Sequence, residues 1–207
     1  AEKFIREYDK SNPFFLQVSF TAPHDPRNMP EEYLDLYDNV EINIPPNFMA
    51  NHPFDNGELD IRDEWLAGYP RTRAEIKSNI LAYYAMITHM DKQIGKIIQS
   101  LDENDLRENT IIVFSSDNGL AVGQHGLMGK QNLYEHSIKV PLIIQGPGIP
   151  QGMKDNKLVY TIDLFPTICD LTGTKKSKSL DGISLVNSIK NIKGTERNSL
   201  IFAYKNS

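Results

Sequence analysis

The middle of this chain carries its most regular alternation of apolar and polar side chains. Over about residues 73–103 the apolar positions recur at steps of three and four, the spacing that puts them on one face of an α-helix. The residues that carry this pattern are Ile76, Ile80, Tyr83, Tyr84, Ile87, Met90, Ile94, Ile97, Ile98 and Leu101. The pattern predicts one long amphipathic helix.

Three short apolar runs predict β-strands. Residues 14–20 (FFLQVSF), 110–115 (TIIVFS) and 140–145 (VPLIIQ) are each nearly apolar throughout, which is typical of strands buried on both faces of a sheet. Each run is followed by a segment rich in glycine, proline, asparagine or aspartate. These residues commonly end a strand and begin a loop.

The remaining segments complete an α/β pattern. A second helix is predicted over residues 163–171, closed by Gly173, and residues 199–204 (SLIFAY) resemble a further strand. Residues 29–70 are rich in proline, asparagine and aspartate with weak periodicity, which predicts a long ordered loop over the surface. Strands that alternate with helices indicate an α/β fold with a largely parallel sheet flanked by helices.

The composition is that of a folded globular chain. The 207 residues are 40% hydrophobic and 24% charged, which argues against wholesale disorder. The net charge is −5 and the basic residues are scattered, so no nucleic-acid partner is expected. No apolar run approaches the roughly 20 residues that cross a bilayer, so no membrane span is expected. Cys169 is the only cysteine, which excludes an intrachain disulfide and a cysteine-based zinc site.

Polar side chains at the carboxyl ends of the predicted strands are candidates for a functional site, because ligands of open α/β sheets collect there. Asp117 and Asn118 offer a carboxylate and an amide oxygen, which are hard ligands suited to calcium or magnesium. A plain Asx turn is the alternative for this segment. His24 lies between prolines that stiffen its loop, and it can donate to an anion or protonate a leaving group. A structural hydrogen bond is the alternative for His24.

Lys130 stands at the end of a loop punctuated by glycine, residues 119–130 (GLAVGQHGLMGK). Glycines let a backbone approach a ligand closely, and an ammonium at this position would bind an anion and stabilise charge that grows in a transition state. A solvated loop lysine is the alternative. Because His24 and Asp117 each follow an apolar run, we expect both to open onto the same edge of the sheet.

A series of short motifs runs along the chain. The motifs are residues 21–26 (TAPHDP), 83–87 (YYAMI), 90–95 (MDKQIG), 116–119 (SDNG), 125–130 (HGLMGK), 134–135 (YE), 140–143 (VPLI), 161–167 (TIDLFPT) and 180–185 (LDGISL). In their order and spacing they resemble the type I, formylglycine-dependent sulfatases of the alkaline phosphatase superfamily. Only residues 27–72 lack a shared motif.

The resemblance implies a site and a chemistry. In that family the residues that match Asp117 and Asn118 complete a calcium site, for which magnesium is the alternative ion. The residues that match Lys130 and His24 contact the sulfate and assist departure of the alcohol. His125 either lines the pocket or pins its loop. The implied reaction is hydrolysis of a sulfate ester by a formylglycine nucleophile, with Lys130 neutralising sulfate oxygens and His24 protonating the leaving alcohol.

Two parts of the family pattern are not found in this chain. The paired aspartates and the Cys-or-Ser-x-Pro-x-Arg motif of the nucleophile do not occur in the 207 residues. Cys169 cannot replace them, because it lacks proline and arginine at the needed offsets. We therefore interpret residues 1–207 as a partial sulfatase catalytic domain, truncated at the N-terminus, in which residues 190–207 begin a C-terminal subdomain. The chain alone is expected to be catalytically silent.

Two alternatives to a sulfatase stay open at this point. A phosphodiester or phosphonate hydrolase of the same superfamily would reuse the fold and the metal ligands, and a non-catalytic module would keep only the anion pocket. The expected partner is a sulfated small molecule or a sulfated glycan, and the truncation is expected to expose surface for self-association. The resemblance also implies a periplasmic or extracellular location. His52, His89 and His136 carry no motif and are assigned no role.

Overall fold

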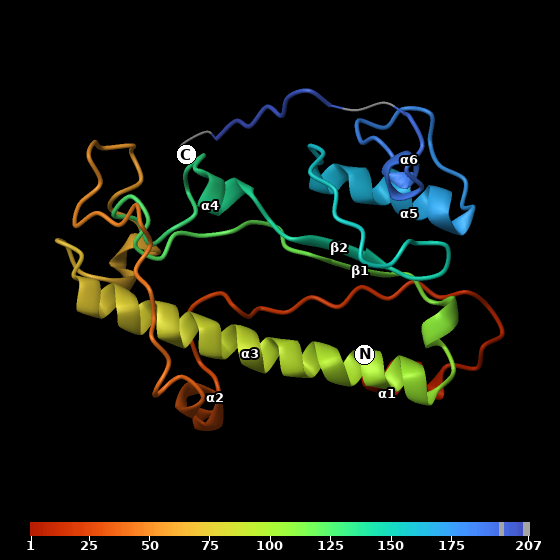
Figure 1. Cartoon of the computed structure of the whole chain (residues 1–207), viewed down its shortest axis with the longest axis horizontal. Helices are drawn as coiled ribbons and strands as arrows, with labels where there is room; N and C mark the ends of the chain where they lie inside the picture. Colours follow the sequence, from red (N-terminus) through yellow and green to blue (C-terminus); the bar gives the residue numbers. More distant parts are fainter. Residues whose placement is uncertain (195–196, 205–207) are drawn as a thin grey trace. The chain divides into compact units, whose positions relative to one another are not determined.

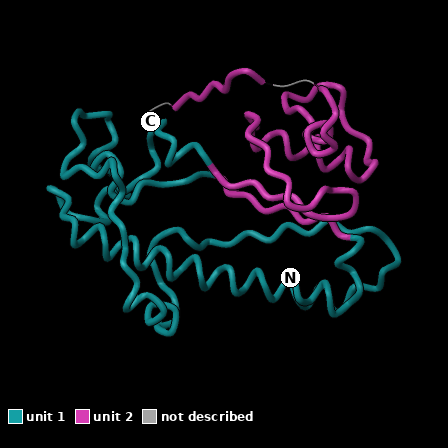
Figure 2. The backbone as a smooth tube through the Cα atoms, viewed as in Figure 1, with its two compact units in different colours: residues 1–109, 118–139, 206–207 teal, residues 110–117, 140–205 magenta. Residues whose placement is uncertain are grey.

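A computed structural model describes residues 1–194 and 197–204 of the chain. The chain divides into two compact units, which Figure 2 shows in different colours. Among the described residues, unit 1 contains residues 1–109 and 118–139, and unit 2 contains residues 110–117 and the chain from residue 140 onward. The boundary at residues 117 and 118 therefore falls inside one of the motifs singled out above.

Unit 1 is organised around α3 (Arg73–Glu103), the long helix in Figure 1, which confirms the helix predicted over this range. Its N-cap is Thr72, whose side-chain oxygen accepts a hydrogen bond from the Glu75 backbone N–H (3.2 Å), the usual arrangement at a helix start. The shorter elements of the unit are α1 (Glu2–Glu7), α2 (Glu31–Asp35), η1 (Glu64–Leu66), η2 (Arg107–Asn109) and α4 (Glu135–Ile138). Of these, α1 and α2 pack against α3.

The core of unit 1 joins α3 to segments that are distant in sequence. The buried core residues are Ile42, Ala67, Ile76, Ile80, Val122 and Met128. Two of them come from α3, and the others come from segments before and after it. At Gly123 the backbone runs so close to α3 that a Cβ atom there would lie 2.6 Å from Ile76 Cγ2. The loop that ends at Lys130 is therefore packed directly onto the long helix.

The described residues of unit 2 form an antiparallel strand pair and short helices. β1 (Ile112–Ser115) pairs with β2 (Leu142–Gln145), with Ser115 opposite Leu142. Both strands lie within ranges predicted from the sequence. The helices are η3 (Thr161–Asp163), α5 (Leu164–Thr172) and α6 (Val186–Ile189). α5 confirms the helix predicted over residues 163–171, and it ends as expected at Gly173, whose φ of 70° is readily adopted by glycine.

Three details of the sheet differ from the predictions. The strand pair seen in residues 1–194 and 197–204 is antiparallel, because the chain leaves the carboxyl end of β1 and returns to that same end. The run at residues 14–20 forms no strand, and its Phe15 is 76% exposed. The run at residues 199–204 forms no strand either. An apolar run becomes a strand only where a neighbour completes its backbone hydrogen bonds, and no described strand pairs with these two.

Two other expectations concern the C-terminal subdomain and a membrane-spanning helix. Within the segment expected to begin a C-terminal subdomain, residues 195–196 and 205–207 lie outside the described residues, so that expectation stays a prediction. Across the described residues, no helix combines the length and the apolar character needed to cross a membrane.

Candidate active site

The segment that carries Lys130 is a loop of unit 1 that closes on itself. Its two ends meet where the Gly119 backbone N–H donates to the Ser137 carbonyl oxygen (2.8 Å). Inside the loop, the Ala121 N–H donates to the Gly129 carbonyl oxygen (3.0 Å). Lys130 follows directly and is half-buried. Lys130 is therefore carried by a loop whose backbone is held by its own hydrogen bonds.

The tip of this loop lies against residues 47–52. The His125 backbone N–H donates to the Asn47 carbonyl oxygen (2.9 Å). At Gly126, where φ is 77°, a Cβ atom would lie 2.6 Å from the Asn51 carbonyl carbon. Only glycine combines this conformation with so close an approach, which explains one of the glycines that punctuate the loop.

His125 is held by its ring as well as by its backbone. Its imidazole stacks on the ring of Tyr134, with centroids 4.1 Å apart, and its Nε2 lies 3.0 Å from Asn47 Nδ2. Its carbonyl oxygen accepts a hydrogen bond from His52 Nδ1 (2.8 Å). These contacts show that His125 fastens the loop tip, and its role in binding substrate stays a prediction.

His136 packs against the same rings and completes a histidine cluster of His52, His125, Tyr134 and His136. Its ring centroid lies 6.0 Å from that of His125 and 5.5 Å from that of Tyr134. Its Nε2 is buried without a hydrogen-bond partner among the described residues. Burial, followed by the nearby charges of His125 and His52, lowers the pKa of His136 to about 4. His136 is therefore neutral at neutral pH.

His24 is oriented by the residue that follows it. Its half-buried ring places Nδ1 2.8 Å from the Asp25 carbonyl oxygen and 3.3 Å from Asp25 Oδ1. Because a carbonyl oxygen can only accept a hydrogen bond, Nδ1 carries a hydrogen in this arrangement. Nε2 is then the ring atom that can take up or release a proton.

Within unit 1, a series of side chains links the loop that contains His24 (residues 21–26) to the loop that contains Lys130 (residues 119–137, called the lysine loop below). Arg62 Nη2 donates to Asp63 Oδ1 (2.5 Å) and lies 3.4 Å from Asp25 Oδ1. The other Asp63 oxygen accepts a hydrogen bond from Gln131 Nε2 (3.0 Å), while Gln131 Oε1 accepts one from the Lys130 backbone N–H (2.9 Å). The structure therefore connects the neighbour of the candidate histidine with the neighbour of the candidate lysine.

Asp63 is the central carboxylate of this link and is 7% exposed. Burial acts to raise its pKa, but hydrogen bonds from Arg62 and Gln131 and the charges of Arg62 and Lys130 outweigh burial and lower the pKa. Asp63 is therefore ionised and interacts with two cations. The charge of Asp63 therefore acts on the Lys130 ammonium, in addition to the hydrogen bonds through Gln131 that reach the Lys130 backbone.

Asp117 and Asn118 fall on either side of the boundary between the units. Asp117 is exposed and belongs to unit 2, whereas Asn118 is half-buried and belongs to unit 1. Their oxygens suit calcium, but two side chains cannot fill a shell of about six to eight oxygens. In the described part of the chain, no group of three His, Cys, Asp or Glu residues is arranged to hold a metal. The expectation that His24 and Asp117 open onto one sheet edge rested on a strand at residues 14–20, and the described residues form no strand there.

Arg62 and Asp63 of this link, and the adjacent Glu64, come from the part of the chain that lacks a recognisable motif. Arg62, Asp63 and Glu64 follow no hydrophobic period, so the sequence indicated only an ordered loop at residues 29–70. The available signal was the density of charge in residues 58–64 (ELDIRDE). That signal does not indicate which residues the charged side chains contact. Glu64, for example, accepts a hydrogen bond from a backbone N–H 64 positions later.

The chain is similar to known sulfatases along most of its length. The family model for sulfatases matches residues 1–174. A sulfatase from Formosa agariphila is 30% identical over 208 residues, covering 98% of this chain and 40% of that protein. An N-acetylglucosamine-6-sulfatase from Bos taurus is 33% identical over 208 residues, covering 98% of this chain and 36% of that protein.

A solved structure shows the same architecture. The phosphonate monoester hydrolase of Agrobacterium radiobacter superimposes with a TM-score of 0.80 at 29% identity, covering 93% of this chain and 41% of that structure. The α/β, alkaline-phosphatase-like fold is therefore confirmed. The chain spans about 40% of the length of the Formosa agariphila relative. Because the family model matches residues 1–174, most of the 207 residues, this chain belongs to the sulfatase family.

Proposed function

We propose that the protein to which this chain belongs hydrolyses sulfate esters, with Lys130 and His24 at the sulfate group. The observation that carries the proposal is the link through Arg62, Asp63 and Gln131, which ties the loops of both residues together inside one unit. Hydrolysis of such an ester needs a cation and a proton donor held in fixed positions. The membership of the sulfatase family supports the same reaction.

Lys130 and His24 would act on opposite sides of the bond that breaks. The Lys130 ammonium would bind a sulfate oxygen and stabilise the charge that develops there. His24, with Nδ1 engaged by Asp25, would hold a proton on Nε2 and pass it to the ester oxygen as the sulfur–oxygen bond breaks. The alcohol then leaves in its neutral form.

Asp117 and Asn118 would supply a carboxylate and an amide oxygen to a calcium ion, with magnesium as the alternative. A bound divalent cation would add positive charge beside the sulfate oxygens. The formylglycine nucleophile implied by the resemblance has no matching motif in the 207 residues. In this proposal the nucleophile and the remaining metal ligands come from a segment outside them.

The proposed substrate is a sulfated glycan or a small sulfate ester. The Bos taurus relative is named N-acetylglucosamine-6-sulfatase, which supports a sulfated sugar. The Agrobacterium radiobacter structure is a phosphonate monoester hydrolase, and it makes phosphonate hydrolysis the second candidate. Both reactions need a cation at a tetrahedral anion, so Lys130 would have the same role in each.

Turnover of the full-length protein on matched chromogenic esters separates these candidates. We expect an aryl sulfate to be hydrolysed faster than the corresponding phosphonate monoester or phosphodiester. Lys130→Ala should lower kcat and kcat/KM together by roughly 10² or more, as expected for loss of a transition-state contact. Faster cleavage of the phosphonate would select the second candidate, and anion binding without turnover of any ester would indicate a non-catalytic module.

A further inference from the structure

Glu64 contacts the lysine loop through both of its carboxylate oxygens. Oε2 accepts a hydrogen bond from the Met128 backbone N–H (2.9 Å), and Oε1 accepts one from the Gly129 N–H (2.8 Å). Glu64 is 3% exposed, so water does not compete for these oxygens. Lys130 directly follows Gly129. The buried carboxylate of Glu64 therefore fixes the backbone immediately before Lys130.

Arg71 balances the charge of this carboxylate. Its Nη2 forms an ion pair with Glu64 Oε2 (2.5 Å), and both side chains are buried. The same guanidinium donates to the carbonyl oxygens of Gly126 (3.2 Å), Glu64 (2.8 Å) and Ala67. A buried ion pair is stable only when its remaining donors and acceptors are satisfied. Here the donors of Arg71 are satisfied in part by the loop itself, at Gly126.

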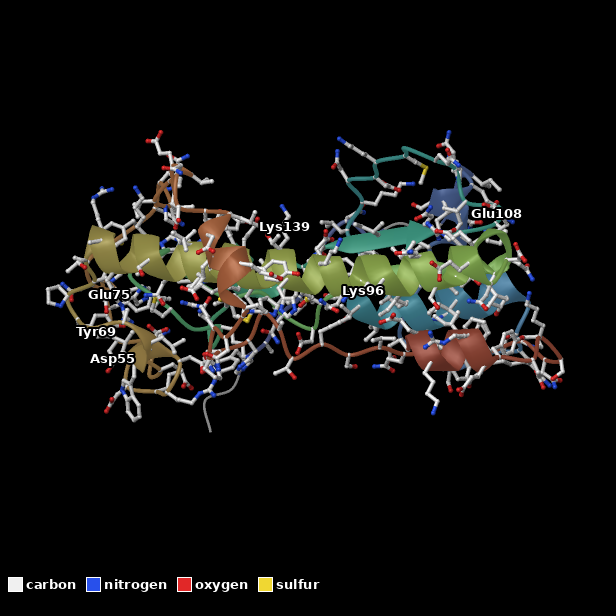
Figure 3. All side chains as sticks on the ribbon, turned by 90° about the horizontal axis from the view of Figure 1, so that it is seen from below. Asp55, Tyr69, Glu75, Lys96, Glu108 and Lys139 are labelled. Carbon is white, nitrogen blue, oxygen red and sulfur yellow. The ribbon has the colours of Figure 1, made fainter. Side chains whose placement is uncertain are left out.

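The ion pair is also tied to the start of α3. The centroid of the Tyr69 ring lies 3.7 Å from the Arg71 guanidinium carbon, and the Tyr69 hydroxyl donates to Glu64 Oε2 (3.2 Å). Figure 3 shows Tyr69 beside Glu75 at this end of the helix, where Glu75 Oε1 accepts a hydrogen bond from the Gly68 N–H (3.0 Å). Burial, followed by the charge of Glu64, raises the pKa of Tyr69. Its hydroxyl therefore keeps the hydrogen that it donates.

Gly129 shows how closely the carboxylate approaches the loop. A Cβ atom at this position would lie 2.7 Å from Gln131 Oε1 and 2.9 Å from Glu64 Oε1. Any side chain here would push one of these groups away. The glycine before Lys130 is thus required for the contact that Glu64 makes.

We propose that Glu64 is a positioning residue for Lys130: its carboxylate, balanced by Arg71, clamps the amides of residues 128 and 129 and so aims the ammonium at the sulfate. The catalytic part of this inference rests on the proposed function, whereas the clamp does not. A carboxylate that accepts from two successive amides forms charge-assisted bonds, which are stronger than neutral ones. A group that acts in a transition state gains from being held to within about 0.5 Å.

Amide hydrogen exchange in the full-length protein tests the clamp without an activity assay. Glu64→Gln should speed exchange at the Met128 and Gly129 amides by roughly 10-fold or more, because one carboxylate oxygen becomes an NH₂ group that cannot accept. Glu64→Asp keeps the charge but is one methylene shorter, so it should also expose at least one of the two amides. This milder variant decides the question if Glu64→Gln does not fold. Unchanged exchange at both amides in either folded variant overturns the clamp.

Asp163→Asn is the matched control. Asp163 is also a buried carboxylate, paired with Arg197 (2.5 Å) and accepting from the Ile183 N–H (2.7 Å), with all of these residues in unit 2. The variant should lower Tm and speed exchange at Ile183. It should leave the amides of Met128 and Gly129 protected and kcat unchanged, which separates a lost clamp from a general loss of stability.

A double-mutant cycle tests the catalytic part. Glu64→Gln should lower kcat by roughly 10-fold in the wild-type background, yet it should not slow Lys130→Ala further, because no ammonium is then left to position. Equal slowing in both backgrounds would show that Glu64 acts through another group. If the wild-type protein turns over no ester, the proposed function fails, while the exchange data still decide the clamp.

Discussion

The ring of His125 stacks on the ring of Tyr134, with centroids 4.1 Å apart and planes inclined by 12°. These two residues flank Lys130 in the sequence, so their contact closes the loop across the residue proposed to bind sulfate. The contact is made by the faces of the rings. A stacked pair of this kind adds stability beyond that of the apolar area it buries.

Tyr134→Leu should therefore destabilise the loop, whereas Tyr134→Phe should not. Loss of the stack should lower the free energy of unfolding by about 0.5–1.5 kcal/mol, measured by urea denaturation of the full-length protein. The phenylalanine variant keeps the ring and serves as the control. Equal destabilisation in both variants would assign the effect to the hydroxyl and contradict the importance of the stack.

His136 should make the stability of the fold depend on pH. Its pKa in the folded chain is about 4 instead of 6.5, because burial and then the charges of His125 and His52 disfavour the imidazolium. Between these values the unfolded chain binds a proton that the folded chain does not. The contribution to stability is thus complete above about pH 6.5 and is lost as the pH falls towards 4.

His136→Phe tests this linkage, because phenylalanine keeps an aromatic ring and cannot be protonated. The drop in Tm from about pH 7 to about pH 5 should be smaller in the variant than in the wild-type protein. Thermal unfolding monitored by circular dichroism at both pH values provides the measurement. Identical drops in the two proteins would mean that His136 does not carry the effect.

Gly119→Ala should open the base of the lysine loop. A Cβ atom there would overlap the His136 carbonyl oxygen, and the bond from Gly119 N–H to Ser137 would be strained. We expect a loss of roughly 1–3 kcal/mol in unfolding free energy and weaker calcium binding by the full-length protein, because Asn118 precedes the displaced residue. Gly95→Ala is the control: it lies in α3 with nothing within 4 Å of its Cβ position, and it should stabilise by about 0.5–1 kcal/mol. Calcium affinity that is equal in wild-type and Gly119→Ala protein would contradict the proposed role of Asn118.

His24→Ala should slow the hydrolysis of esters with poor leaving groups more than that of esters with good leaving groups. An alkyl or sugar alcohol leaves slowly unless its oxygen is protonated, whereas a nitrophenolate needs little assistance. The ratio of kcat/KM for an aryl sulfate to that for a sugar sulfate should rise in the variant by roughly 10-fold or more. A uniform loss across both esters would indicate that His24 binds sulfate without donating a proton.

The 207-residue chain by itself should bind calcium weakly and show no sulfatase turnover. Asp117 and Asn118 supply only part of a shell that takes about six to eight oxygens, so the ion would remain mostly hydrated. Calorimetric titration with calcium and an aryl sulfate assay of the isolated chain check this expectation. Micromolar affinity, or turnover that Lys130→Ala abolishes, would show that the chain contains a complete site.

Features that depend on residues close together in the chain could be predicted from the sequence. The bounds of α3 and the end of α5 at Gly173 could be predicted because helix periodicity and helix caps are local. The strands at residues 112–115 and 142–145 could be located for the same reason. The order of the short motifs around His24 and Lys130 was sufficient to indicate the family, because each motif is contiguous in the chain.

The pairing of the apolar runs and the contacts that hold the lysine loop could be seen only in the folded chain. The direction of the β1–β2 pair and the unpaired state of residues 14–20 depend on partners elsewhere in the chain. Arg71, Glu64 and His52 bond to backbone groups 55, 64 and 73 positions later. A hydrogen bond between a side chain and a distant peptide group leaves no periodic pattern in the sequence. It also requires no particular residue type at the position that contributes the peptide group. Such a bond exists only once the core has folded and brought the two segments together.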